Sequence, residues 1–133
     1  GYIADVCFPG RKLDAGVDLS EPALAISRQR GKYASVLHAD AGKHIPAADG
    51  SFGTIFNNSG IEHIDDLDGA IREIARVLRP GGTVHMNVLN SRYFDWWPHP
   101  RSTADDYRRY QPFHHALDEA GWKTHLPPLV ARD

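Results

Sequence analysis

The chain has 133 residues, of which 41% are hydrophobic, and this size fits one domain with a single modest core. Its 15 basic and 17 acidic residues leave a formal net charge of -2, so no overall positive field attracts nucleic acid or anionic membranes. No apolar run approaches the roughly 20 residues of a membrane span, no signal peptide is visible, and no Cys/His pattern indicates zinc. We therefore expect a cytoplasmic protein without a nucleic-acid partner, a metal or a membrane span. Cys7, the single cysteine, is expected to be a small buried apolar residue.

Short apolar segments alternate with segments of helical spacing along the chain, and this alternation is typical of α/β proteins. The elements predicted in the N-terminal half are a helix at 2–8, a strand at 13–19, a helix at 21–30 and strands at 35–39 and 54–57. Ser20 is expected to cap the second helix, where Glu21 and Pro22 suit the first turn and Gly31 the end.

The clearest helix follows at Asp65 or Asp66, either of which can cap it. Five apolar side chains fall on one side of this helix: Leu67, Ile71, Ile74, Ala75 and Leu78. The charged side chains point away from that side: Arg72, Glu73, Arg76 and Arg79. The run Pro80-Gly81-Gly82 is expected to stop the helix abruptly, before a strand at 83–89.

The remaining chain is predicted to be less regular. Residues 90–112 form a long segment, and a loop of that length in a compact domain is usually functional or disordered. Its aromatic side chains include Tyr93, Phe94, Trp96, Trp97 and Tyr107. A last helix is predicted at 113–120, closed by Gly121, and residues 125–130, broken by two prolines, are predicted to begin an edge strand.

Two motifs flank the clearest helix. Residues 52–64 read F-G-T-I-F-N-N-S-G-I-E-H-I, and residues 78–83 read L-R-P-G-G-T. This order of strand, polar elbow, Glu-His pair, helix and Pro-Gly-Gly turn resembles the class I S-adenosylmethionine-dependent methyltransferases, in particular the small-molecule group that methylates quinones, sugars and lipids. The resemblance extends from Gly1 to about Trp122. Gly53 departs from the family pattern, which commonly has an aspartate there as a structural turn residue.

The resemblance implies an α/β fold, a Rossmann-like three-layer sandwich with a mostly parallel sheet that lacks its first strand here. Within a single partial domain, residues 1–89 would bind the cofactor, residues 90–112 would form a substrate loop, and residues 113–133 would supply a C-terminal helix and an edge strand. Gly1 is similar to the end of the family's glycine-rich loop. We therefore expect the native gene to encode one more strand and the glycine loop upstream.

The resemblance also implies S-adenosylmethionine as the cofactor. Asp18, at the end of a strand, would accept hydrogen bonds from both ribose hydroxyls, because a carboxylate offers two acceptor oxygens to a vicinal diol. Leu19 would pack on the adenine, and Asp40 and Ala41 would contact the adenine amino group and a ring nitrogen. The alternatives are a helix cap or solvated acid for Asp18 and an Asx turn for Asp40.

The polar elbow is implied to line the methionine end of the cofactor. It consists of Asn57, Asn58 and Ser59, for which a plain polar loop is the alternative. Gly1 would belong to the loop whose glycines allow close backbone approach to the cofactor's carboxylate.

The reaction of the family is an in-line attack by an acceptor atom on the sulfonium methyl group, and it needs a base only if the acceptor must lose a proton. His63 is the candidate base, because an imidazole titrates near neutral pH. Glu62 is a candidate of the same kind, and helix capping or packing is the alternative for His63. The aromatic residues of the segment 90–110 suit an apolar or sugar-ring acceptor. The alternative is that they pack in the hydrophobic core. We expect a small-molecule acceptor that is sugar, lipid or quinone-like, with a preference for sugars and lipid-linked intermediates.

Two other functions are compatible with parts of this pattern. A nicotinamide-dependent oxidoreductase also has an acid at the end of its second strand, but no Tyr-x-x-x-Lys spacing occurs in this chain. A noncatalytic relic or fragment would keep the fold without binding the cofactor. No pattern in the sequence indicates the atom methylated or the oligomeric state.

Overall fold

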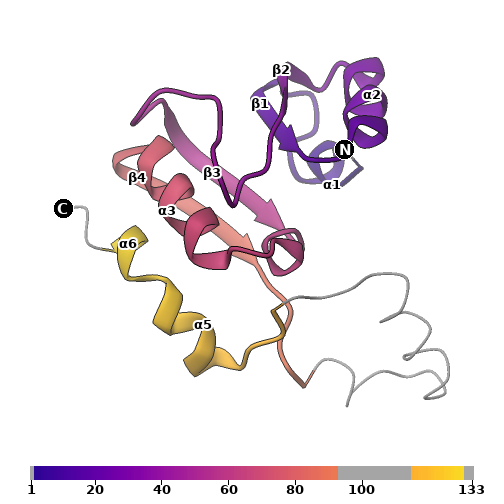
Figure 1. Ribbon diagram of the computed structural model, residues 1–133. Helices are drawn as coiled ribbons and strands as arrows, with labels where there is room; N and C mark the ends of the chain where they lie inside the picture. The colour runs from indigo at the N-terminus through magenta and orange to yellow at the C-terminus, as the bar shows by residue number, and fades with distance from the viewer. Residues whose placement is uncertain (1, 93–114, 131–133) are drawn as a thin grey trace, which may run out of the picture.

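The computed structural model describes residues 2–92 and 115–130 (Figure 1). The elements of the first half are α1 (Tyr2–Cys7), β1 (Leu13–Asp18), α2 (Glu21–Arg30) and β2 (Tyr33–His38). They are followed by β3 (Phe52–Asn58), the short 3-10 helix η1 (Ile61–His63), α3 (Leu67–Val77), β4 (Leu78–Asn87), α5 (Glu119–His125) and α6 (Pro127–Val130). None of these described helices is long and apolar enough to span a bilayer.

The described strands form two parallel pairs. In one pair Asp18 of β1 lies opposite His38 of β2, and in the other Asn58 of β3 lies opposite Asn87 of β4. All of this strand pairing is parallel, as predicted. The expected sheet is divided, however, because within the described ranges no ladder joins the β1–β2 pair to the β3–β4 pair. In each pair the carboxyl ends of both strands lie at the same edge.

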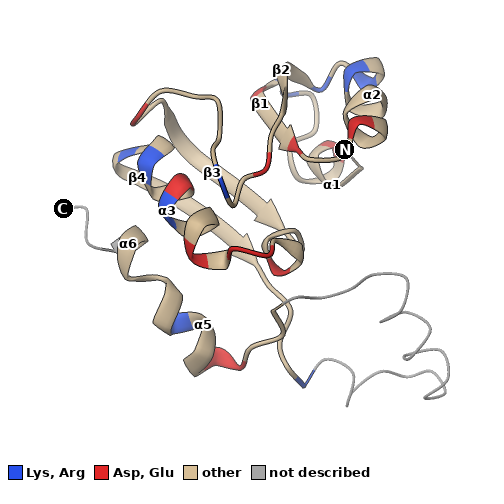
Figure 2. Cartoon of the chain, viewed as in Figure 1, with Lys and Arg blue, Asp and Glu red and all other residues tan. Residues whose placement is uncertain are grey.

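The ends of α2 confirm the predicted caps. The Ser20 hydroxyl accepts a hydrogen bond from Ala23 N at 3.5 Å, and Gly31 closes the helix with a φ of 63°. Figure 2 shows acidic residues at the start of α2, α3 and α5, where a negative charge faces the positive end of the helix dipole.

The core lies where α3 packs on β3 and β4 and where α5 and α6 pack beside α3 (Figure 1). Asp66 caps α3 by accepting a hydrogen bond from Gly69 N at 2.8 Å. The buried residues of this core are Ile61, Leu67, Ala70, Ile71, Ile74 and Trp122. Each fully buried leucine or isoleucine side chain stabilises the fold by about 1.5–3 kcal/mol relative to an exposed one. The apolar side of α3 is therefore the main support of the β3–β4 pair.

The turn after α3 differs from the prediction. The helix ends at Val77 and β4 already begins at Leu78, so Pro80-Gly81-Gly82 lies inside the strand and not before it. The ladder with β3 is irregular at this point, and Gly81 adopts a φ of 68° that a glycine accepts without strain. The Arg79 guanidinium lies over Gly53, where an added methyl group would come within 2.9 Å of Arg79 Cζ.

The predicted last helix is wrong in its position. Residues 115–118 are not helical, and α5 begins at Glu119. Asp118 is its cap and accepts a hydrogen bond from Gly121 N at 2.7 Å. Gly121 therefore lies in the first turn of the helix and does not end it. The first two residues of the predicted helix, 113 and 114, lie outside the described residues.

The predicted edge strand at 125–130 is also wrong. Residues Pro127–Val130 form the short helix α6, which starts with both prolines. Proline suits the first turn of a helix, because the N–H group that it lacks has no partner within the helix there. Cys7 is exposed rather than buried, because α1 buries only Ala4.

Candidate functional site

Asp18 is the last residue of β1 and is exposed at the carboxyl edge of the β1–β2 pair. Its Oδ1 accepts a hydrogen bond from Ser20 N at 2.8 Å, so the side chain also supports the turn into α2. Leu19 is 63% exposed, and its carbonyl oxygen lies 2.9 Å from His38 Nε2. Ser20, and not Asp18, is thus the cap of α2. The Asp18 side chain supports the turn before the helix and is open to solvent at a strand end, where ligands bind in α/β folds.

Asp40 and Ala41 follow β2 at the same edge, and both are half-buried. Asp40 Oδ1 accepts a hydrogen bond from Gly42 N at 3.0 Å, which is the Asx turn that the sequence left open. Lys43 Nζ lies 3.2 Å from Asp40 Oδ2. The carboxylate of Asp40 is therefore held by its own loop, which fixes the direction of the backbone at Ala41.

The elbow comprises the last two residues of β3, Asn57 and Asn58, and Ser59, which has an unfavourable backbone conformation. Asn57 Oδ1 accepts a hydrogen bond from Ile61 N at 3.4 Å, and Asn58 Oδ1 accepts one from Asn87 Nδ2 at 3.2 Å. Ser59 has a φ of 51°, and within the described ranges it is the one non-glycine residue with a positive φ. Its N–H donates to the Asn87 carbonyl oxygen at 3.0 Å. Backbone strain of this kind gathers at ligand sites, where the surrounding structure maintains it.

The two candidate bases lie together on η1. His63 is half-buried. Glu62 is fully buried, and neither of its carboxylate oxygens has a hydrogen-bond partner among the described residues. Its backbone carbonyl accepts a hydrogen bond from His115 N at 3.1 Å. A buried polar group without a partner lowers stability, so packing alone does not account for a glutamate at position 62.

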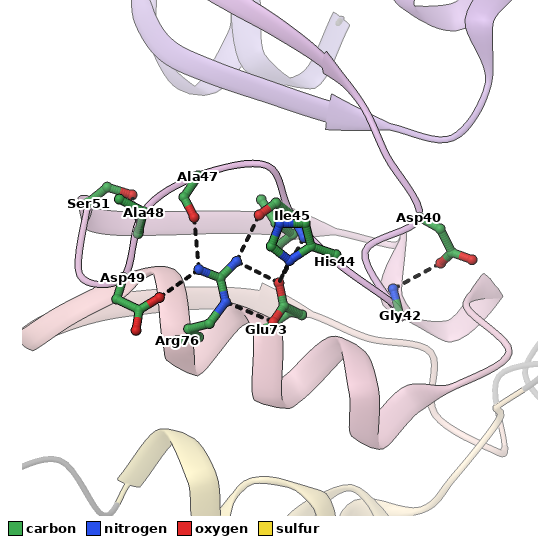
Figure 3. A network of polar contacts seen from close by, with 10 residues as sticks. All are labelled: Asp40, Gly42, His44, Ile45, Ala47, Ala48, Asp49, Ser51, Glu73 and Arg76. Atoms are coloured by element: carbon green, nitrogen blue, oxygen red, sulfur yellow. Dashed lines mark hydrogen bonds and ion pairs between the residues drawn. The ribbon is translucent and has the colours of Figure 1, made fainter.

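Sequence reasoning missed a polar network between α3 and the connecting loop, which we define as residues 39–51 between β2 and β3 (Figure 3). Its centre is the pair Glu73 and Arg76, whose side chains are only 14% and 24% exposed. The sequence signal was the spacing of three residues between an acid and an arginine on one helix. This spacing indicated an ion pair between Glu73 and Arg76, but it did not indicate that the connecting loop covers the pair.

The network fixes the charge of both partners. The hydrogen bonds from Arg76 are the main reason that the pKa of Glu73 falls to about 2, and the Ile45 backbone N–H lowers it further. Conversely, the carboxylates of Glu73 and Asp49 raise the pKa of Arg76. Both groups are therefore charged at neutral pH.

The structure gathers the candidate residues in two groups. The first, at the end of the β1–β2 pair, contains Asp18, Leu19, Asp40 and Ala41. The second contains Asn57 and Asn58 at the end of β3, with Ser59, Glu62 and His63 directly after it. Gly1 lies outside the described residues. An apolar cavity of about 360 Å³ between β4, α5 and α6 has none of these residues in its lining. In the part of the chain that the structure describes, no group of three His, Cys, Asp or Glu side chains is arranged to hold a metal ion.

Known proteins are similar to this chain in sequence. Residues 6–86 match the family model of the methyltransferase domain. The chain is 37% identical over 80 residues to a demethylmenaquinone methyltransferase of Chlorobaculum parvum, covering 59% of this chain and 32% of that protein. It is 29% identical over 82 residues to a ubiquinone biosynthesis O-methyltransferase of Aromatoleum aromaticum, covering 59% and 35%. The chain thus spans about a third of the length of these relatives.

Solved structures share the fold. A SAM-dependent methyltransferase of Thermotoga maritima has a TM-score of 0.66 at 22% identity, over 85% of this chain and 52% of that chain. A complex of the Haloferax volcanii Trm112 methyltransferase activator with a methyltransferase gives 0.67 at 18% identity, over 94% of this chain and 53% of that chain. The fold is accordingly the α/β, Rossmann-like one. Because the family model covers residues 6–86, the chain belongs to the class I S-adenosylmethionine-dependent methyltransferases.

Proposed function

We propose that the protein transfers the methyl group of S-adenosylmethionine to a small-molecule acceptor. The observation that carries this proposal is the pair of polar strand ends: an exposed Asp18 at the carboxyl edge of β1 and the strained Ser59 at the carboxyl edge of β3. The family membership supports methyl transfer rather than hydride transfer to or from a nicotinamide.

The residues present fit the two ends of such a cofactor. A carboxylate at Asp18 can accept from two ribose hydroxyls, and Leu19, which is 63% exposed, offers an apolar surface to the adenine. Asp40, whose Oδ1 also forms the Asx turn, and Ala41 are proposed to contact the adenine amino group and a ring nitrogen. The elbow of Asn57, Asn58 and Ser59 supplies amide and hydroxyl groups for the methionine end. Gly1, whose backbone would approach the cofactor's carboxylate, completes the proposed set.

The bound cofactor would supply an electrophilic sulfonium methyl group, so the protein has mainly to align the acceptor and exclude water. His63 remains the candidate base. Glu62 is the second candidate, supported by its burial and by the lack of a partner for its carboxylate among the described residues. Either side chain would accept a proton from an acceptor hydroxyl or carbon acid, and an acceptor that is already nucleophilic would need neither.

We place the acceptor among small molecules of sugar, lipid or quinone-like type. The names of the relatives refer to demethylmenaquinone and to ubiquinone biosynthesis. They favour the quinone-like class over the sugars and lipid-linked intermediates that the sequence alone preferred. Residues 90–112 are proposed as the acceptor segment, and all but the first three of them lie outside the described residues. Residues 1–89 are proposed as the cofactor-binding part and residues 113–133 as a C-terminal part, in which the described helices are α5 and α6.

Titration of S-adenosylhomocysteine into the full-length protein tests this function. We expect Asp18→Ala to weaken binding at least about tenfold, since hydrogen bonds to a charged group contribute about 1.5–3 kcal/mol each. The matched control is Asp14→Ala, which removes an exposed acid from the other end of the same strand and should leave the affinity unchanged.

Equal affinity of the wild type and Asp18→Ala would remove Asp18 from the site. A folded wild-type protein that does not bind S-adenosylhomocysteine would overturn the proposed function and favour the noncatalytic relic.

A further inference from the structure

The connecting loop lies along α3 from its first turn to its last (Figure 3). At the start, the backbone of Gly42 touches Gly69: a methyl group added to Gly69 would lie 2.1 Å from the Gly42 carbonyl oxygen. At the end, Gly50 N donates to the Arg76 carbonyl oxygen at 2.9 Å. Loop and helix therefore run in the same direction, with contacts at both ends.

Between these ends, Glu73 and Arg76 bind the loop backbone directly. Ile45 N donates to Glu73 Oε2 at 2.8 Å, and Arg76 Nη2 donates to the Ile45 carbonyl oxygen at 2.8 Å. Arg76 Nη1 donates to the carbonyl oxygen of Ala47 and to Asp49 Oδ1, each at 2.8 Å. The guanidinium also donates to both carboxylate oxygens of Glu73. Because the guanidinium is planar, these bonds fix the loop in one orientation.

The position of this loop matters because it connects the two strand pairs. It leaves β2 just before Asp40 and enters β3 at Phe52. No described strand ladder joins the two pairs, although the rings of Phe8 and Phe56 meet between them with centroids 5.3 Å apart. Since α3 packs on β3 and β4, a loop fixed to α3 is also fixed to the pair that carries the elbow.

We propose that Glu73 and Arg76 are positioning residues that hold the Asp40–Ala41 corner at a set distance from the Asn57–Ser59 elbow. This inference rests on the proposed function, in which the adenosine part of the cofactor lies at the first group and the amino-acid part at the second. Only a ligand that spans both groups requires this alignment. Holding a ligand's two ends in register contributes to affinity, and misplacement by about 1 Å can cost on the order of a hundredfold in function.

Two ligands separate alignment from simple support of the fold. S-adenosylhomocysteine spans both groups, whereas 5′-methylthioadenosine has the adenosine part and lacks the amino-acid end. We expect Arg76→Met, in the full-length protein, to weaken S-adenosylhomocysteine binding at least about tenfold and 5′-methylthioadenosine binding less than about threefold. Arg76→Lys should fall between, because a lysine keeps the charge but cannot donate to the same set of acceptors.

Arg72→Met is the matched control. Arg72 lies one turn earlier on α3 with a side chain that is 64% exposed, so its loss should leave both affinities unchanged. If Arg76→Met does not fold, Glu73→Gln takes its place, because a glutamine still accepts from Ile45 N but loses the ion pair. Circular dichroism and a thermal melt identify the variants that are folded.

Four outcomes decide between a positioning role, a structural role and the absence of cofactor binding. A selective loss for the longer ligand supports the positioning role. Unchanged affinities in a folded variant with a lowered melting temperature show a merely structural role and overturn the inference, as do equal losses for both ligands. A wild-type protein that binds neither ligand overturns the proposed function itself, and this result is distinct because it precedes any substitution.

Discussion

Gly69 is the point of closest approach between α3 and the connecting loop. Asp66 accepts a hydrogen bond from its N–H, and the Gly42 carbonyl oxygen occupies the space that a side chain would need. A glycine three residues after a helix cap costs helix propensity, so its presence here reflects the contact with the loop. The residue that permits this contact is thus in the first turn of α3, away from the charged pair.

We predict that Gly69→Ala lowers the free energy of unfolding by about 1–3 kcal/mol, because the added methyl group would lie 2.1 Å from the Gly42 carbonyl oxygen and force the loop away. Urea unfolding followed by circular dichroism measures the change. Gly121→Ala is the matched control: Gly121 occupies the same position after the cap of α5, and its nearest contact is 3.0 Å. Equal destabilisation of the two variants would contradict the role assigned to Gly69.

Ser59 and Glu62 are the other residues in unfavourable states. One adopts a positive φ without being a glycine, and the other is a fully buried carboxyl whose oxygens have no partner among the described residues. Neither state is visible in the sequence, where both residues are part of a polar motif. A positive φ and a buried carboxylate without a partner both lower stability, and a protein keeps them only where the rest of the fold offsets the loss. The elbow and η1 are therefore candidates for a functional role.

Among the elements, α5 is held in position by a buried hydrogen bond, by core packing and by a contact with the first turn of α3. The Trp122 Nε1–H donates to the Leu89 carbonyl oxygen at 2.9 Å, and Trp122 also packs against the apolar side of α3. A second link is the contact of 2.6 Å between His125 Nδ1 and Asp68 Oδ1. That contact is the main reason that the pKa of Asp68 is lowered.

We predict that Trp122→Phe lowers the free energy of unfolding by about 1–3 kcal/mol, because it leaves the buried Leu89 carbonyl without its donor. Chemical denaturation monitored by far-UV circular dichroism gives the value. Thr124→Val serves as the control in the same helix, since the Thr124 hydroxyl bond to the Gly121 carbonyl is exposed. A stability of Trp122→Phe equal to that of the wild type would show that the hydrogen bond contributes little to docking of α5.

At the scale of the whole molecule, the two strand pairs are joined through the connecting loop and its network with α3. Because the pKa of Glu73 falls from 4.5 to about 2, its charge stabilises the folded state fully above pH 4.5, and this contribution is lost as pH falls toward 2. The groups that face it are Arg76, with Asp49 beside it, and His44, whose Nδ1 lies 3.3 Å from Glu73 Oε2.

We predict that the wild type loses more stability than Glu73→Gln between pH 5 and pH 2. The difference should be on the order of 1–2 kcal/mol, below the full value of the shift because the network is partly open to solvent. Urea titrations at a series of pH values, with Arg72→Met as the unchanged reference, provide the comparison. Parallel pH profiles of the wild type and Glu73→Gln would show that Glu73 is not held in its charged form by the network.

The order of elements as far as α3, apart from η1, could be predicted from the sequence, as could the cap at Ser20, a cap at either Asp65 or Asp66, and the family. These features depend on residues close together in the chain: a cap needs a polar side chain within three residues, and helical or strand spacing is read over one or two turns. The C-terminal elements were predicted wrongly for two reasons. Asp118 caps the start of α5, although the predicted helix ended two residues later, and the two prolines begin the helix α6 where a strand was predicted.

How these elements combine could not be predicted in this way, because it depends on contacts between residues far apart in the chain. The division into two parallel pairs, the strain at Ser59 and the burial of Glu62 depend on which segments pack together. The same holds for the Arg76 network, whose loop partners lie 27 to 31 residues away in the chain. The physical reason is that a charged side chain on a helix has the same local pattern whether water or a loop faces it, and only packing distant in sequence distinguishes the two.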